Sequence, residues 1–224
     1  MEFNLIEALG KLAMLYLPLL FSLCFHEYAH AFVAKIKGDN TAELMGRLTL
    51  NPFAHMDIVG TLVLPVMAIL MSWGFLFGWA KPVPVNPRNL KDPLKDMFWV
   101  SLAGPLSNVL LALLAGVALF LVLIFGAGTA GGAAFKEMIT MFIYINFLLA
   151  IFNLIPLYPL DGAKILARFL PYDWNRFLEE RQAQLNMALV ILFVLGGFRF
   201  LAYPIHFFTF HLIQTVENLA YLVS

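Results

Sequence analysis

The sequence has few charged residues and almost no cysteine. Only 12% of its 224 residues are charged, compared with about 25% in soluble domains, whereas 62% are hydrophobic. Basic and acidic residues balance at 14 each, so the net charge is zero and a nucleic acid is not an expected partner. The single cysteine, Cys24, excludes an internal disulfide. Together with a mean hydropathy of +0.84, this composition predicts a polytopic membrane protein.

Long apolar segments are the most prominent pattern in the chain. A helix needs about 20 apolar residues to cross the hydrocarbon core of a bilayer. Six segments approach or exceed that length, at 12–34, 58–79, 98–125, 137–157, 184–203 and 205–222. We therefore expect an all-α polytopic membrane protein with five to six transmembrane or re-entrant helical segments in contact with the lipid bilayer.

The connections between these segments leave no room for an additional folded domain. The longest of them, 158–183, is far shorter than an ordinary domain, and the sequence shows no internal repeat. We expect residues 1–224 to form a single membrane-embedded domain, with a core at 12–170 and a C-terminal helical pair at 184–222.

Basic residues are concentrated in three connections, at 35–57, 80–97 and 158–183, whereas 126–136 contains only Lys136. Connections rich in lysine and arginine stay on the cytoplasmic side of a membrane. We therefore expect a multi-pass protein of the cell membrane whose N-terminus lies outside and whose C-terminus lies inside.

The same rule gives segment 58–79 cytoplasmic flanks at both ends. This segment either re-enters and returns to the same side or crosses fully in violation of the rule. Three potential helix breakers favour the re-entrant path, namely Pro65, Gly74 and Gly78.

An HExxH motif lies in one of the most apolar stretches, as His26-Glu27-Tyr28-Ala29-His30. His26 and His30 are four residues apart, so a helix places them on one face, close enough to bind one metal ion. In zinc hydrolases the glutamate of this motif accepts a proton from metal-bound water. Ionisable groups within a membrane span are costly to bury, which favours a functional role here.

A catalytic zinc ion takes three protein ligands and keeps one open position. Asp161 is a candidate third ligand, because it follows the prolines that end segment 137–157 and precedes Gly162. An aspartate is also a preferred N-cap for a following helix, here 163–170. The residues alone leave these two interpretations open.

Several motifs in the first 170 residues resemble the site-2 protease family, the zinc intramembrane metalloproteases. The similar stretches are Phe25–Ala31, Gly46–Pro52, Gly78–Val85, Ala103–Asn108 and Asn153–Gly162. The absence of an appended domain resembles the minimal bacterial subgroup. The resemblance implies one Zn²⁺ per chain, bound by His26, His30 and Asp161, with Glu27 as the catalytic base. It also implies cleavage of transmembrane segments of other membrane proteins near the cytoplasmic face.

Two asparagines near apolar helices have both a functional and a structural interpretation. Asn153 and Asn108 could contact the substrate or stabilise the oxyanion, as catalytic residues. Each could instead form a hydrogen bond between helices, as asparagine commonly does in membranes. The resemblance favours a catalytic role for Asn153 and leaves Asn108 undecided.

Residues 43–52 alternate polar and apolar side chains, as a strand does, and resemble a membrane-associated β-loop of the family. Such a loop would pair with an unwound substrate by strand addition. His55 and Asp57 could form a second metal or regulatory pair, but loop capping is the simpler interpretation. We expect His206 and His211 to lie at the membrane interface.

Two other functional classes compete with proteolysis. A metal transporter would need a polar path across the membrane, and the sequence places its ionisable groups in one cluster. A non-catalytic zinc-binding scaffold would be expected to lose Glu27 or a metal ligand, and all of them are present. The sequence predicts neither the substrate nor the oligomeric state.

Overall fold

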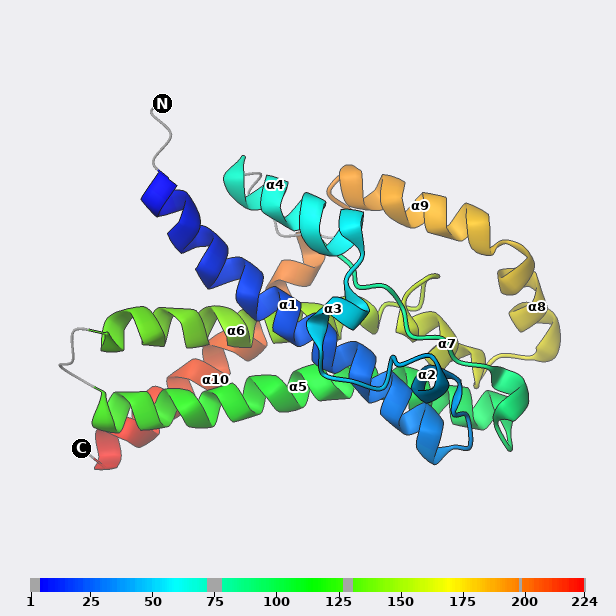
Figure 1. Cartoon of the computed structure of the whole chain (residues 1–224), viewed down its shortest axis with the longest axis horizontal. Helices are drawn as coiled ribbons and strands as arrows, with labels where there is room; N and C mark the ends of the chain where they lie inside the picture. The colour runs from blue at the N-terminus through cyan, green and yellow to red at the C-terminus, as the bar shows by residue number, and fades with distance from the viewer. Residues whose placement is uncertain (1–4, 72–77, 127–130, 198, 224) are drawn as a thin grey trace.

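The computed structural model describes residues 5–71, 78–126, 131–197 and 199–223, and within these ranges the chain is helical with no β-strand. Figure 1 shows the arrangement of the helices. The longer ones are α1 (Leu5–Ile36), α5 (Pro93–Phe125), α6 (Gly132–Asn153), α9 (Gln182–Val194) and α10 (Ala202–Val223). The shorter ones are α2 (Thr41–Leu44), α3 (Pro52–His55), α4 (Leu64–Leu70), α7 (Asp161–Ala167) and α8 (Tyr172–Glu180). A π-helical turn, Ile58–Val63, leads into α4, and 3-10 turns lie at Pro87–Asn89 and Arg199–Leu201.

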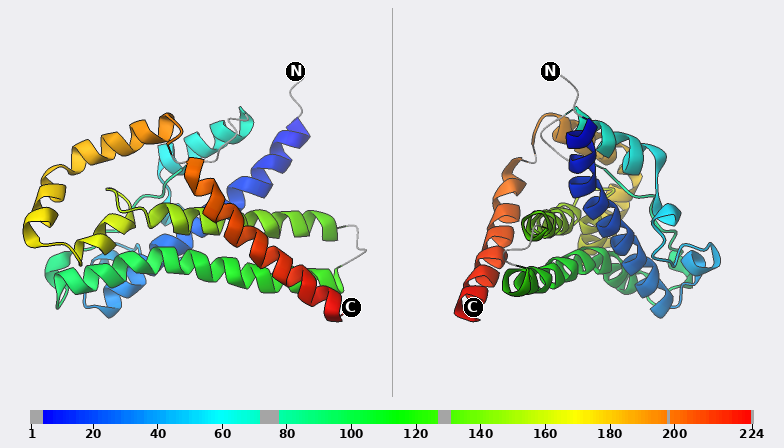
Figure 2. Two further views of the ribbon diagram at one scale, coloured as in Figure 1. Left: turned by 180° about the vertical axis from the view of Figure 1, so that it is seen from behind. Right: turned by 60° about the vertical axis from the view of Figure 1, so that its left-hand side comes forward.

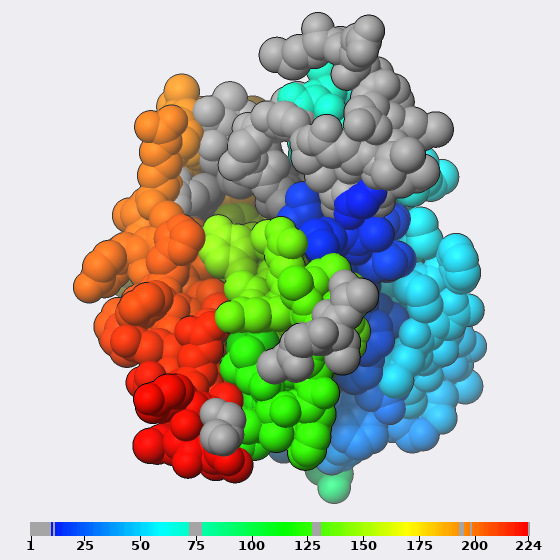
Figure 3. Space-filling model, turned by 90° about the vertical axis from the view of Figure 1, so that its left-hand side faces the viewer, coloured from blue at the N-terminus to red at the C-terminus, as the bar shows by residue number. Residues whose placement is uncertain are grey.

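Helices α5 and α6 form the centre of the molecule, with α1 packed on one side and α10 on the other (Figure 2). The view in Figure 3 shows this order directly, with α10, the ends of α5 and α6, and α1 side by side. Leu119 and Ile143 are fully buried between α5 and α6, and Val216 of α10 packs on the same cluster. Ala112 and Ala115 lie in this contact, where small residues allow helix backbones to approach closely.

A second apolar cluster joins α1 to α6. It contains Leu19 and Leu23 of α1, and Ile145 and Leu149 of α6. The segment between α1 and α5, which includes α2, α3 and α4, covers the remaining side of α1 (Figure 2). Helix α1 is therefore covered on several sides along the half that contains the HExxH motif.

Asp39 connects the end of α1 to the loop before α5. Its carboxylate accepts hydrogen bonds from the backbone and hydroxyl of Thr41, from the Asn86 backbone and from the Asn89 amide. Burial alone would raise the pKa of this carboxyl, but the four hydrogen bonds outweigh it and the pKa is lowered.

Three helices in the described residues are long and apolar enough to cross a membrane: Leu12–Ile36, Pro93–Phe125 and Gly132–Asn153. They coincide with the predicted segments 12–34, 98–125 and 137–157. Segment 205–222 forms α10, a helix of 22 residues that is not among these three. Segment 184–203 is not one helix, because α9 ends at Val194 and a 3-10 turn follows.

Within the described residues of segment 58–79, the helix extends over Ile58–Leu70. The chain then returns to the start of this helix, where the Trp79 backbone N–H donates to the Gly60 carbonyl at 3.1 Å. The Thr61 hydroxyl donates to the Trp79 carbonyl at 2.7 Å. Gly74, one of the predicted breakers, lies outside the described residues.

The predicted β-loop near 43–52 is not confirmed. Residues 41–44 form α2, and a turn with Gly46 at a φ of +67° follows. The alternating pattern does not separate a buried face from an exposed one, since Arg47 is 8% exposed and Leu50 is 47% exposed. The Arg47 guanidinium donates to the Lys81 carbonyl at 2.6 Å, so an individual side-chain contact holds this segment in place of strand pairing.

Candidate metal centre

The structure brings His26, His30 and Asp161 together. The Nε2 atoms of the two histidines are 3.0 Å apart, and each lies 3.1 Å from Oδ2 of Asp161. The histidines are one turn apart on α1, and Asp161 is the first residue of α7, 135 residues after His26. All three side chains are buried. They form a compact three-donor group whose two histidines lie in the C-terminal half of a membrane-length helix.

This donor set fits a zinc ion. Two imidazole nitrogens and a carboxylate oxygen are common zinc ligands, and donors about 2.0–2.2 Å from one ion at tetrahedral angles lie roughly 3.3 Å apart. The observed separations of 3.0–3.1 Å are close to that spacing. Both imidazoles direct Nε2 towards the group, because their Nδ1 atoms are bonded elsewhere: His26 to Asn108 Oδ1 and His30 to the Val100 carbonyl, each at 2.7 Å.

At Gly104 the backbone of α5 lies in direct contact with the two imidazole rings. A Cβ atom at this position would come within 2.5 Å of His30 Nε2 and 2.6 Å of His26 Cε1. Only glycine allows this approach, since no side chain fits between the helix and the rings. The sequence placed Gly104 in a motif shared with the family but did not assign it this role.

The break after α6 places Asp161 at the metal group. The chain folds back so closely that a Cβ at Gly162 would overlap the carbonyls of Leu154 and Ile155. The N-cap of α7 is Leu160, not Asp161, and the Asp161 carboxylate contacts the histidines. These contacts place Asp161 in a group that could hold a metal ion, and Asp161 is not the N-cap residue of α7.

Glu27 lies between the two histidine ligands in the sequence and is 9% exposed. Its Oε2 accepts a hydrogen bond of 2.7 Å from the backbone N–H of Val83. Val83 lies between Pro82 and Pro84, which have no N–H, so it carries the one backbone donor of these three residues. The sequence reasoning did not single out Val83, although a lone donor between two prolines was a signal for it.

The two asparagines proposed as catalytic lie in different environments. Asn108 is fully buried behind His26 and accepts a hydrogen bond from its Nδ1. Asn153 is half-buried at the end of α6, and its amide donates to the Leu149 carbonyl at 2.9 Å. Asn108 contacts Nδ1 of the His26 ring and not Nε2, the atom that faces the donor group. A residue in this position can orient the imidazole without contacting the metal ion.

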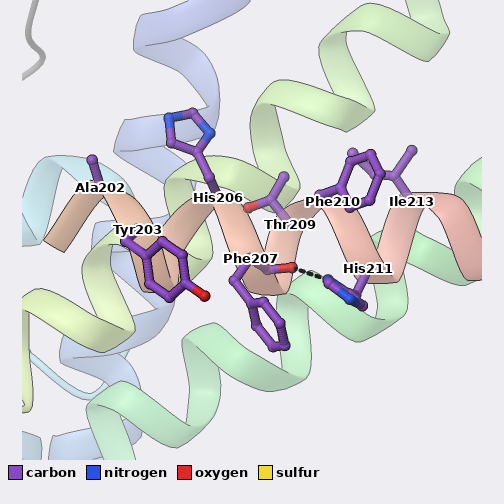
Figure 4. Close-up of a pocket in the computed structure, with 8 residues that line it drawn as sticks. All are labelled: Ala202, Tyr203, His206, Phe207, Thr209, Phe210, His211 and Ile213. Carbon is purple, nitrogen blue, oxygen red and sulfur yellow. Dashed lines mark hydrogen bonds between the residues drawn. The ribbon is translucent and has the colours of Figure 1, made fainter.

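The remaining histidines lie outside the three-donor group. His55 Nε2 donates to the Thr49 carbonyl at 2.8 Å, and Asp57 caps the π-helical turn through the Val59 and Gly60 amides. His206 and His211 are among the residues that line a shallow pocket on α10. Figure 4 shows these side chains and the hydrogen bond from His211 Nδ1 to the Phe207 carbonyl. The loop-capping interpretation of Asp57 agrees with these contacts.

Comparison with known proteins identifies the family. The family model "Peptidase family M50" matches residues 121–197, which include Asp161. The chain is 36% identical to "Putative zinc metalloprotease YwhC" of Bacillus subtilis over 188 residues, 83% of this chain and 82% of the relative. It is 33% identical to "Putative zinc metalloprotease Rip2" of Mycobacterium tuberculosis over 190 residues, 83% of this chain and 67% of the relative.

No solved structure matches the chain. The sequence similarity to the Bacillus subtilis relative nevertheless extends over most of both proteins. The group that could hold a metal ion includes both histidines of the HExxH motif. The chain belongs to peptidase family M50, the site-2 protease family of zinc metallopeptidases.

Proposed function

We propose that this zinc metalloendopeptidase cleaves peptide bonds within transmembrane segments of other membrane proteins, near the cytoplasmic face of the cell membrane. The observation that carries the proposal is the position of the donor group on α1. His26 and His30 lie within Leu12–Ile36, a helix with the length and hydropathy of a membrane span, and Asp161 completes the group from α7. A hydrolytic centre inside a span acts on segments that also lie in the membrane.

The depth of the site follows from helix geometry and charge. His26 is ten residues before Ile36, the last residue of α1, which corresponds to about 15 Å along the helix axis. Lys35 and Lys37 lie at that end, and the Lys37 ammonium pairs with Asp96 at 3.1 Å. Positive residues favour the cytoplasmic side, so the proposal places the metal group in the cytoplasmic half of the membrane.

Segment 58–79 is proposed as a re-entrant element. A helix over Ile58–Leu70 is about 20 Å long, whereas the hydrocarbon core is about 30 Å thick. The hydrogen bonds of the Trp79 backbone with Gly60 and Thr61 bring the end of the segment back to its beginning. Both observations support a path that enters and leaves on one side, as the basic flanks predict.

The proposed chemistry assigns separate roles to the side chains. His26, His30 and Asp161 would hold the zinc ion, which would supply Lewis-acid activation of a water molecule. Glu27 would act as the base that accepts a proton from the attacking water and passes it to the leaving amine nitrogen. The Val83 N–H bonded to Oε2 holds the Glu27 carboxylate in one orientation and leaves Oε1 for this transfer.

Asn153 remains a proposed oxyanion contact. Its amide donates to the Leu149 carbonyl, a helical i−4 contact, so stabilising a developing oxyanion requires the side chain to turn away from α6. Asn108 is proposed to act on His26 rather than on the substrate, because its Oδ1 is engaged by the imidazole.

The test uses purified protein in detergent, a generic transmembrane-helix substrate, and the Glu27→Gln variant as the matched control. We expect cleavage by the wild type, loss of cleavage on zinc chelation, and no cleavage by Glu27→Gln with zinc still bound. Zinc binding without cleavage by the wild type, on a panel of several transmembrane substrates, would favour the non-catalytic scaffold. The intact base and ligand set argues against that alternative.

A further inference from the structure

Three uncharged polar side chains are completely buried behind His26. They are Ser22 of α1, Asn108 of α5 and Asn146 of α6, and each has no exposed surface. A buried amide or hydroxyl without a partner is costly, so three of them in one cluster require a complete set of hydrogen bonds. The motifs that identify the family include Asn108 but not Ser22 or Asn146.

These side chains form one continuous chain of hydrogen bonds that ends at the metal ligand. The Ser22 hydroxyl donates to the Pro18 carbonyl at 2.7 Å, and the Asn146 amide donates to Ser22 Oγ at 2.9 Å. The Asn108 amide donates to Asn146 Oδ1 at 2.9 Å. His26 Nδ1 lies 2.7 Å from Asn108 Oδ1. The chain crosses three helices and joins each of them to one imidazole ring.

Backbone carbonyls fix the direction of every bond in this chain. Asn146 Nδ2 lies 2.9 Å from the Phe142 carbonyl, and Asn108 Nδ2 lies 3.3 Å from the Ser22 carbonyl. A carbonyl only accepts hydrogen bonds, so both of these atoms must be NH₂ groups and both Oδ1 atoms must face the next member of the chain. Asn108 Oδ1 therefore accepts from His26, and the proton of the neutral imidazole is held on Nδ1.

We propose that Asn146 and Ser22 are positioning residues that hold Asn108, and through it His26, in the tautomer and ring orientation that direct the Nε2 lone pair at the metal. A proton on Nδ1 leaves Nε2 free to coordinate. If Asn108 turned over, its NH₂ group would face Nδ1 and favour the opposite tautomer, with a proton on Nε2. Asn146 opposes this reversal together with the Ser22 carbonyl, because both accept from the Asn108 amide, and the Asn146 contact is the shorter, at 2.9 Å against 3.3 Å.

The two histidine ligands are oriented in different ways. His30 Nδ1 donates to the Val100 backbone carbonyl, which cannot turn over and needs no further support. His26 depends on a side-chain amide, whose two ends are nearly equal in shape and opposite in hydrogen bonding. This difference explains why a network of buried side chains supports His26, whereas a single backbone contact orients His30.

The test is zinc affinity, measured by competition with a chelating dye on the full chain in detergent. We expect Asn146→Leu to bind zinc roughly 10–100-fold more weakly, which is the range for loss of an outer-shell partner. The absorption spectrum of the Co²⁺-loaded protein should also change, because the geometry at His26 is altered. Thr209→Val is the matched control, since Thr209 is a buried polar residue on α10 whose hydroxyl has no hydrogen-bond partner among the described residues.

A second substitution separates orientation from general packing. A carboxylate at position 108 accepts from His26 Nδ1 whichever way it turns, so Asn108→Asp should make the ligand independent of Asn146. Asn146→Leu should then weaken zinc binding by no more than a few-fold in the Asn108→Asp background. An equal loss in both backgrounds, or zinc affinity of Asn146→Leu equal to wild type, would overturn the proposal.

Ser22→Ala provides a test if Asn146→Leu does not fold. It removes one acceptor of the Asn146 amide and leaves the Phe142 carbonyl, so we expect a smaller but measurable loss of zinc affinity. Unchanged affinity and an unchanged Co²⁺ spectrum in Ser22→Ala would contradict the proposal. The proposal rests on the proposed metal site but not on proteolysis, because both readouts are independent of substrate cleavage.

Discussion

Gly104 of α5 lies directly against the imidazole ring of His30, so close that a Cβ at this position would be 2.5 Å from Nε2. The metal group is therefore shaped by a helix that contributes no ligand to it. The α5 backbone at Gly104 limits where both imidazole rings can lie. Hydrogen bonds to the Nδ1 atoms limit the rotation of the rings.

Gly104→Ala is expected to abolish zinc binding or weaken it by orders of magnitude, because the added methyl group displaces the metal-binding nitrogens. Zinc content after dialysis measures the effect. Gly116→Ala on the same helix is the control, since its Cβ would meet the flexible Leu212 side chain at 3.2 Å. Full zinc content in Gly104→Ala would show that the rings can move without loss of the site.

Glu27→Gln is expected to lower cleavage by roughly 10²–10⁴-fold, the usual contribution of a general base, with zinc affinity unchanged. The glutamine keeps an oxygen that can accept from the Val83 N–H but cannot take up the proton. Single-turnover cleavage and zinc titration on the same preparation measure the two effects. Loss of zinc together with activity would indicate a structural role for Glu27.

Zinc is expected to stabilise the folded chain by mass action. At a free concentration 100 times the dissociation constant, a ligand that binds only the native state adds about 2.7 kcal/mol. Thermal unfolding with buffered zinc and with a chelator measures this difference. The difference should disappear in Asp161→Ala, which loses one of the three donors, and its persistence there would place the stabilising ion elsewhere.

The stability of the fold is expected to fall at acid pH through Asp39. Its pKa is lowered in the folded chain, so its contribution is fully present above the unfolded value of about 3.9 and is lost as pH falls below it. Unfolding of wild type and Asp39→Asn between pH 6 and pH 3 measures this, and the variant should show a weaker pH dependence. Asp173→Asn, at an exposed position of α8, is the control. Identical slopes for wild type and Asp39→Asn would exclude this role.

Cysteines at positions 53 and 91 are expected to react with a membrane-impermeant reagent from the same side of the membrane. These positions flank the proposed re-entrant segment, and both side chains are exposed. A cysteine at the exposed position 131, beyond the α5 span, should react from the opposite side. A Cys24→Ala background removes the native thiol. Reaction of positions 53 and 131 from one side would instead establish a full crossing.

The sequence predicted the local features of the site well, because they depend on short spacings. Two histidines four residues apart share a helix face in any helix, and the apolar length of α1 follows from composition. The predicted β-loop is not confirmed, for a related reason. Its alternating pattern was local, whereas the buried Arg47 guanidinium forms a hydrogen bond with the Lys81 carbonyl, 34 residues away.

The sequence by itself indicated the membrane character of this protein, the HExxH histidines and, through family resemblance, Asp161 as the candidate third ligand. Only the tertiary structure decided which groups surround them: Gly104 over the rings, Val83 on Glu27, and the chain from Ser22 through Asn146 and Asn108 to His26. The physical reason is that these contacts join residues up to 124 positions apart. Such contacts depend on how the helices pack, which no local spacing in the sequence specifies.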